Sequence, residues 1–131
     1  MKDYASMSDF EINSAAHNAL LDKPYELTFH GGGKITWKDK DSGRVIETGI
    51  VGYTKNGLHD YCNNPADAWP IIVENKISTM WMTAEKEWCA WSGGDLEEGC
   101  WEWENIPDYY FSGESPLRAA MIVFLMMKEG E

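Results

Sequence analysis

Basic residues are scarce in this sequence. Lysine and arginine together number 11, against 22 aspartate and glutamate residues, which gives a formal net charge of −11. A protein that neutralises phosphates needs a surface rich in lysine and arginine. We therefore expect neither bare nucleic acid nor an anionic membrane as a direct partner.

Cysteine and long hydrophobic runs are also scarce. The three cysteines, Cys62, Cys89 and Cys100, are odd in number and irregularly spaced, which argues against a disulfide framework. The longest apolar run, residues 117–127, contains Arg118 and is too short to cross a bilayer. We expect a protein of the reducing cytoplasm with no membrane association.

Motifs that carry catalysis or phosphate binding are missing. The sequence contains no GxSxG, HExxH or P-loop pattern. His59 and Cys62 are two ligand types spaced three apart, but structural zinc sites usually show two paired ligand motifs. We therefore expect no catalytic residue, no metal and no cofactor. An uncharacterised hydrolase-type activity is the alternative, and it would need a nucleophile and a base brought together by the fold.

The composition is that of one folded domain covering residues 1–131, because 44% of the residues are hydrophobic and 25% are charged. A first helix is indicated by Ser8 and Glu11, which have the spacing of a capping box. A buried helical stripe follows this start at the expected spacing: Ile12, Ala15, Ala16, Ala19 and Leu20.

Alternating apolar and polar residues then predict strands. Residues 25–29, a second strand around Ile35 and Trp37, and residues 44–53 form an expected antiparallel meander with turns at 31–33 and 41–43. Further short strands are expected at residues 77–83, 88–91 and 100–103.

A second helix begins either after Asn64, which places Pro70 in its second turn, or after Asp67, which places Pro70 harmlessly in its first. We expect Ala68, Trp69, Ile72 and Val73 to share its inward face.

The last helix is expected to start with Ser115 as cap and Pro116 at its first position. Its apolar side chains occupy nearly every side, so they must be covered within the chain or by a second copy. The expected homodimer interface comprises five of them: Met121, Val123, Phe124, Met126 and Met127.

The order of elements is helix, strands, helix, strands, helix. This order predicts an α+β fold in which an antiparallel sheet of about five or six short strands is packed by three helices, in an arrangement like an α/β/α sandwich.

Two segments resemble a known family. Residues 61–78 read YCNNPADAWPIIVENKIS and residues 115–129 read SPLRAAMIVFLMMKE. Together with the early MSDFEIN, they are similar to the NinX family of small proteins from the nin region of lambdoid bacteriophages and prophages. A more distant similarity is to the phage α/β/α sandwich domain. The resemblance implies a phage accessory protein of the bacterial cytoplasm, and it brings no assigned reaction and no catalytic residue.

Residues 85–114 form the least ordinary segment. They carry nine carboxylates against the single cation Lys86, a net charge of −8, together with seven aromatic residues. Aromatic anchors surrounded by carboxylates suit a basic partner. The alternative interpretation is structural: the tryptophans are core residues and the acidic residues form a solvated face.

On this basis we predict that the chain binds and modulates a host or phage protein that is basic or binds nucleic acid; mimicry of DNA is the extreme form. The predicted contact residues are Glu85, Glu87, Trp88, Trp91, Asp95, Glu97, Glu98, Trp101, Glu102, Trp103, Glu104 and Asp108. The alternative function is a protein that binds or sequesters a small ligand, as a monomer or an oligomer, and whose aromatics stack a nucleotide-like molecule. The charge of that ligand would be compensated by Lys34, Lys38, Lys40 and Arg44.

Overall fold

The structure is a computed structural model that describes residues 3–21, 25–29, 34–49, 59–96, 103–105 and 107–130. A short 3-10 turn, Tyr4–Ser6, precedes the helices α1 (Asp9–Leu21), α2 (Pro65–Glu74) and α3 (Pro116–Glu129). The strands are β1 (Tyr25–Phe29), β2 (Lys34–Asp39), β3 (Val45–Gly49), β4 (Ser78–Met82), β5 (Glu87–Ser92), β6 (Asp95–Leu96), β7 (Trp103–Asn105) and β8 (Tyr109–Gly113).

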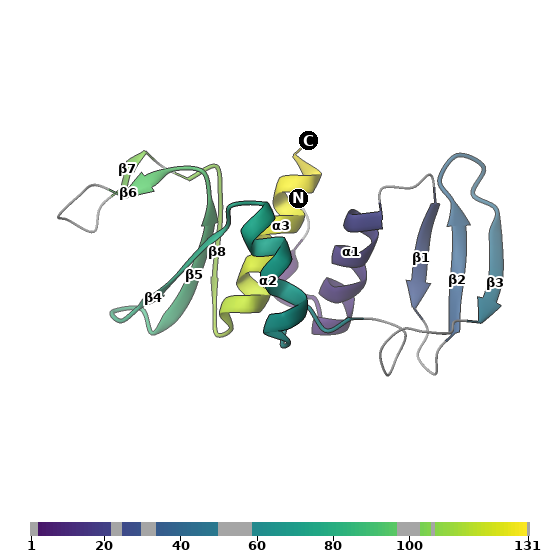
Figure 1. The fold of residues 1–131 in the computed structure, drawn as a ribbon, viewed down its shortest axis with the longest axis horizontal. Helices are drawn as coiled ribbons and strands as arrows, with labels where there is room; N and C mark the ends of the chain where they lie inside the picture. Colours follow the sequence, from purple (N-terminus) through teal and green to yellow (C-terminus); the bar gives the residue numbers. More distant parts are fainter. Residues whose placement is uncertain are drawn as a thin grey trace.

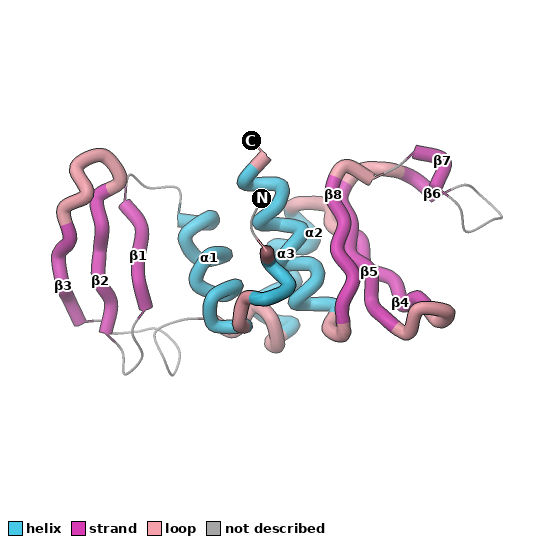
Figure 2. Tube along the Cα trace, turned by 180° about the vertical axis from the view of Figure 1, so that it is seen from behind, coloured by secondary structure: helices cyan, strands magenta, loops and turns pink. Residues whose placement is uncertain are grey.

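The strands form separate antiparallel sheets. One has the order β1-β2-β3 and is called the meander sheet, another has the order β4-β5-β8 and is called the C-terminal sheet, and β6 pairs only with β7. The helices lie between the two three-stranded sheets (Figure 1). The same three layers are visible from behind (Figure 2).

The α+β class and the three helices are confirmed, but a single sheet of five or six strands is not found in the described part of the chain. The helices also lie between sheets, which is the reverse of an α/β/α sandwich. The physical reason is α3. Because it is apolar on nearly every side, it takes the centre and is covered by α1 and α2 as well as by the C-terminal sheet.

Helix starts agree with the sequence signals. The Ser8 hydroxyl accepts from the Glu11 amide at 3.1 Å, and the Glu11 carboxylate accepts from the Ser8 amide at 3.1 Å, so the capping box is present. The Asn64 side chain caps α2 through the Ala66 amide, which decides between the two possible starts and places Pro70 inside the helix. The Ser115 hydroxyl caps α3 at the Arg118 amide.

The core is built around α3, whose residues 119–125 are all buried. It contacts Ile12 and Ala16 of α1, Ile71 and Ile72 of α2, and Ala90 of β5 as members of one apolar cluster. A single chain is therefore enough to cover most of this helix.

One chain covers much of the expected homodimer interface on α3. Met121, Val123 and Phe124 are 0% exposed within one chain, and Met126 and Met127 are partly buried against the same core. The expected interface depended on their being uncovered. The core therefore covers Met121, Val123 and Phe124, whereas Met126 and Met127 keep part of their surface, and the homodimer stays a prediction.

Two inward faces differ from the sequence prediction. On α1, Leu20 is exposed, whereas Asn13 and His17 are buried. On α2, Trp69 and Val73 are exposed at 62% and 49%, whereas Ala68 and Ile72 are buried as expected. Periodicity alone cannot show that Asn13 is buried, because its side chain hydrogen-bonds Asp60 and the Cys62 amide, which lie far along the chain.

Candidate functional site

The candidate site is the outer face of the C-terminal sheet. In this sheet Ala90 is fully buried, and Phe111, its register partner on β8, packs against the core. These two residues therefore mark the face that covers α3. Side chains alternate along each strand, so their immediate neighbours point to the opposite, outer face.

Register brings six residues together on this outer face. Cys89 of β5 stands opposite Met80, Met82 stands opposite Glu87, and Trp91 stands opposite Tyr110 of β8. Directly opposed side chains on one face are close enough to contact. We call the set Met80, Met82, Glu87, Cys89, Trp91 and Tyr110 the outer-face patch.

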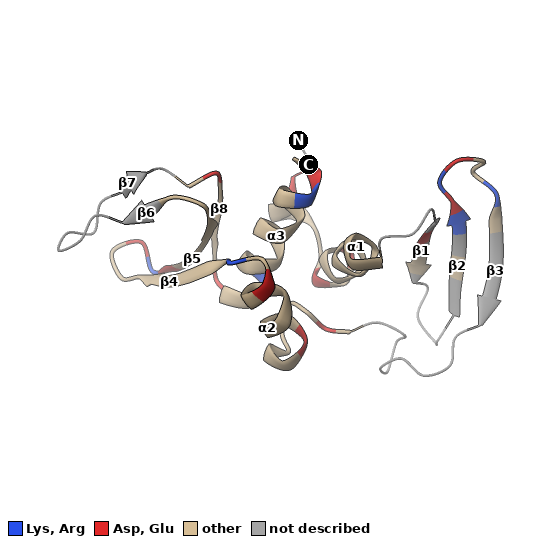
Figure 3. Ribbon diagram, turned by 45° about the horizontal axis from the view of Figure 1, so that its top comes forward, with Lys and Arg blue, Asp and Glu red and all other residues tan. Residues whose placement is uncertain are grey.

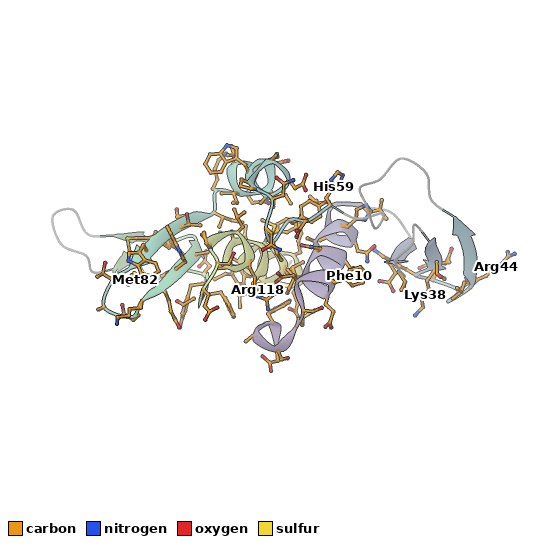
Figure 4. All side chains as sticks on the ribbon, turned by 90° about the horizontal axis from the view of Figure 1, so that it is seen from below. Phe10, Lys38, Arg44, His59, Met82 and Arg118 are labelled. Atoms are coloured by element: carbon orange, nitrogen blue, oxygen red, sulfur yellow. The ribbon has the colours of Figure 1, made fainter. Side chains whose placement is uncertain are left out.

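The patch exposes mainly aromatic surface, and the Cys89 side chain at its centre is buried, at 8% exposure. Tyr110 is 61% exposed, while Trp91, Met80 and Met82 are half-buried. Met82 lies at the part of the sheet far from α1 (Figure 4). Exposed aromatic residues and methionine are common in the centre of protein interfaces, because they supply contact area at low conformational cost.

Carboxylates border this patch. Glu85 in the β4–β5 turn, Glu87 on β5, Asp108 before β8 and Glu114 after it are all exposed. Among these positions of the sheet and its turns, Lys86 is the one described cation (Figure 3). The described part of the predicted contact segment therefore combines aromatic surface with negative charge.

The predicted contact residues do not all share this face. Glu87 and Trp91 belong to the outer-face patch, but Trp88 points to the helix side of the sheet, one residue away from Glu87. There Trp88 stands edge to face with Trp81, with ring centroids 5.6 Å apart. Glu85 and Asp108 lie in the turn and the connection that border the sheet.

The remaining predicted contacts lie outside the described side chains. Asp95 is in β6 and Trp103 and Glu104 are in β7 as backbone, and their side chains are not described. The same holds for four further predicted contacts: Glu97, Glu98, Trp101 and Glu102.

The structure also shows aromatic residues that the predicted contact set omitted. Trp81 is 45% exposed, and Tyr110 is the most exposed aromatic of the sheet. Tyr110 was missed because residues 109–113 were not assigned to a strand. The signal was the run Tyr109, Tyr110 and Phe111 after Pro107, whose aromatic composition favours a strand.

A polar network joins α1 to the segment before α2. Asn13 donates to Asp60 at 3.0 Å and accepts from the Cys62 amide at 3.0 Å. His59 Nδ1 lies 3.3 Å from Asp67 of α2. Burial raises the pKa of the Cys62 thiol to about 12, and the nearby Asp9 adds to this.

This network does not have the geometry of a metal centre. His59 Nδ1 lies beside the Asp67 carboxylate, whereas the Cys62 thiol lies 3.9 Å from the carbonyl oxygen of Asp9, so the pair spaced three apart has different side-chain neighbours. Within the described ranges, no three His, Cys, Asp or Glu residues are grouped so that they could hold a metal ion. The raised pKa also disfavours the thiolate, which is the form of cysteine that binds metals and attacks substrates.

The basic group predicted for the alternative ligand lies elsewhere. Lys38, Lys40 and Arg44 are exposed on β2 and the following turn, in the meander sheet. The helices separate this sheet from β5 (Figures 1 and 3), the strand that carries Trp88 and Trp91. The structure therefore does not bring the basic group and these aromatics into one nucleotide site.

These observations define the class of protein: a small α+β protein in which an apolar central helix supports an aromatic and acidic sheet face. No helix of the described residues is long and apolar enough to span a membrane.

The family follows from comparison with known proteins. A family model described as NinX of bacteriophage P22 matches residues 3–128, nearly the whole chain. The chain therefore belongs to the NinX family, which confirms the resemblance seen in residues 61–78 and 115–129. Searches of curated proteins and of solved structures found no match.

Proposed function

We propose that this NinX-family protein is a phage accessory protein that binds a host or phage protein of basic or nucleic-acid-binding character. The contact surface is the outer-face patch with its bordering carboxylates. The observation that carries the proposal is the exposure of Tyr110, at 61%, on a sheet face whose neighbouring charged groups are almost all acidic.

The arrangement supports separate roles for the two kinds of residue. Trp91 and Tyr110 are register neighbours and supply contact area, and the flanking methionines adapt to a partner's shape. Glu85, Glu87 and Asp108 attract a positively charged partner and disfavour acidic ones. Through the same charges the chain repels nucleic acid itself.

A comparison of charge variants tests this proposal. A protein that the wild-type chain retains from infected-cell lysate is purified and titrated with the wild type and with Glu85→Gln/Glu87→Gln at low and at high salt. We expect the double variant to bind about 3–10 times more weakly at low salt, and this difference to shrink at high salt because exposed charges are screened.

The matched control removes two exposed charges elsewhere, with Asp41→Asn in the β2–β3 turn and Glu74→Gln in α2. This control removes the same number of negative charges, two, as the double variant does. If it weakens binding as much as the double variant does, the total charge and not the outer-face patch is responsible, and the proposed surface is wrong.

A further inference from the structure

The strand β4 forms an open edge of the C-terminal sheet. β4 and β8 lie on either side of β5 (Figure 2), and among the described strands β4 pairs with β5 alone. Its outward backbone amides and carbonyls therefore have no partner strand in the described part of the chain. Such an edge is a template for another strand, which can extend the sheet through main-chain hydrogen bonds.

This edge lacks the features that usually prevent such pairing. Exposed edges are commonly protected by lysine, proline, a β-bulge or a very short strand. β4 reads STMWM, with five residues, no charged residue and no proline, and its register with β5 is regular. Ser78 and Thr79 are exposed and Trp81 is 45% exposed, so side chains of this strand are open to a partner.

The opposite edge of the sheet, on β8, has a different charge pattern. Asp108 precedes β8 and Glu114 follows it, and both are exposed. Antiparallel pairing of two copies through β8 would bring Asp108 of one copy beside Glu114 of the other. Like charges across a strand pair are destabilising. Pairing between copies is therefore disfavoured at the edge formed by β8.

The charges at the ends of β4 favour a second copy of this chain as the added strand. Lys76 precedes β4 and Glu85 follows it, and both are exposed. Full overlap of two antiparallel β4 strands places Met80 opposite Met80 of the second copy, and it brings Lys76 of each copy beside Glu85 of the other. Further out, Glu74 and Lys86 repeat this relation with the signs reversed. Opposite charges across a strand pair stabilise it.

The same register also matches the side chains within the strand. On the face toward the helices, Thr79 lies opposite Trp81 of the second copy, and on the outer face Ser78 lies opposite Met82. An aromatic residue opposite a β-branched residue is a favourable cross-strand pair. The exposed part of Trp81 is thereby covered, and no like charges are opposed within the strand.

We propose that the chain forms a weak homodimer through antiparallel pairing of β4 with β4 of a second copy. The two C-terminal sheets become one continuous sheet. This interface differs from the α3 interface expected from the sequence. The outer faces of the two sheets lie on the same side and stay open, so the dimer presents two outer-face patches next to each other. The inference goes beyond the proposed function and does not depend on it.

Sedimentation equilibrium of the full chain tests the oligomeric state. A single pair of short strands makes a small interface, so we expect a dimer with a Kd on the order of 10–100 µM. Trp81→Lys should weaken it at least about tenfold, because a lysine on an edge strand opposes pairing. A wild-type chain that stays monomeric up to about 500 µM overturns the proposal.

The matched control is Trp69→Lys. Trp69 is 62% exposed on α2, away from the edge of the sheet, and this substitution changes the net charge by the same amount as Trp81→Lys. The control should leave the Kd unchanged. An equal loss of the dimer in both variants shows that the interface is not at β4 and contradicts the proposal.

A charge exchange tests the antiparallel register. Lys76→Glu and Glu85→Lys should each weaken the dimer about 3–10 times, because each brings like charges together at both ends of the strand pair. The double variant Lys76→Glu/Glu85→Lys restores opposite charges and should recover the wild-type Kd to within about twofold. If net charge alone governed association, the two single variants would shift the Kd in opposite directions, and that result contradicts the proposal.

A thermal melt of each variant establishes that it is folded, and the charge exchange remains decisive if Trp81→Lys does not fold. A dimer that is lost in Met127→Gln but unchanged in Trp81→Lys would place the interface on α3 and overturn the proposal. Tyr110→Ser in the outer-face patch should leave the dimer unchanged, so this proposal and the proposed function fail separately.

Discussion

Arg118 is the side chain that ties the N-terminal segment to α3. Its guanidinium lies 2.9 Å from the Asp9 carboxylate and donates to the carbonyl oxygens of Tyr4 and Met7 at 3.1 and 2.6 Å. We predict that Arg118→Ala lowers the free energy of unfolding by about 2–3 kcal/mol, because these acceptors lose a charged donor. Urea denaturation measures this. Arg44→Ala, at an exposed position, should change it by less than about 0.5 kcal/mol; similar losses in both variants would contradict the role of Arg118.

Cys62 should be chemically inert in the folded protein. Burial and the neighbouring Asp9 raise the pKa of its thiol to about 12, so little reactive thiolate is present near neutral pH. We predict that iodoacetamide modifies Cys62 only when the chain is unfolded in urea, with the site identified by mass spectrometry. Modification of the folded chain at the rate of an unfolded peptide would show that the thiol is accessible and ionised.

His17 should make stability depend on pH. Burial first, and the nearby His59 second, lower the pKa of His17 below its usual 6.5. In the unfolded chain the His17 side chain gains a proton near pH 6.5, whereas in the folded chain it stays neutral at this pH. The free energy of unfolding is therefore highest above this pH and falls as the pH decreases through it. Urea denaturation at about pH 7.5 and about pH 5.5 should show a larger loss for the wild type than for His17→Gln. An equal or smaller loss in the wild type would refute this assignment.

Helix α2 contains a proline at an interior position, where proline is disfavoured. Pro70 lies inside the helix and is exposed, and it has no amide to donate to the carbonyl of Ala66, four residues earlier. We predict that Pro70→Ala raises the free energy of unfolding by about 1–2 kcal/mol, as measured by urea denaturation. Pro65→Ala, at the first helical position where proline is well tolerated, should give no such gain. A loss of stability in Pro70→Ala would mean that the proline is needed by the fold.

Helix starts and hairpins could be predicted because their signals are local. The capping box of Ser8 and Glu11, the caps Asn64 and Ser115, and the meander of β1 to β3 follow from residues close in sequence. The inward faces of α1 and α2 were harder to predict. Trp69 is exposed because the contacts of α2 with the core run through Ala68, Ile71 and Ile72, and this choice depends on segments far away in the chain.

At the level of the whole molecule, the layer order could not be read from the element order. A sequence shows that the last helix is apolar on nearly all sides, but not whether helices, a sheet or a second copy cover it. In the structure, α1, α2 and the C-terminal sheet cover this helix. The candidate site was predicted in part: the acidic aromatic segment supplies Glu87 and Trp91, but without β8 the pairing of Trp91 with Tyr110 could not be foreseen.

The outer-face patch is the surface that we propose binds a basic protein. The most direct measurement is quantitative mass spectrometry of proteins that the wild-type chain retains from infected-cell lysate, compared with Tyr110→Ser and with the α2 surface control Val73→Ser. Both substituted side chains are exposed, so both variants should fold.

We predict that a basic protein is retained by the wild type and by Val73→Ser, and is lost from Tyr110→Ser. Retention of the same proteins in equal amounts by all three would show that the outer-face patch is not the contact surface.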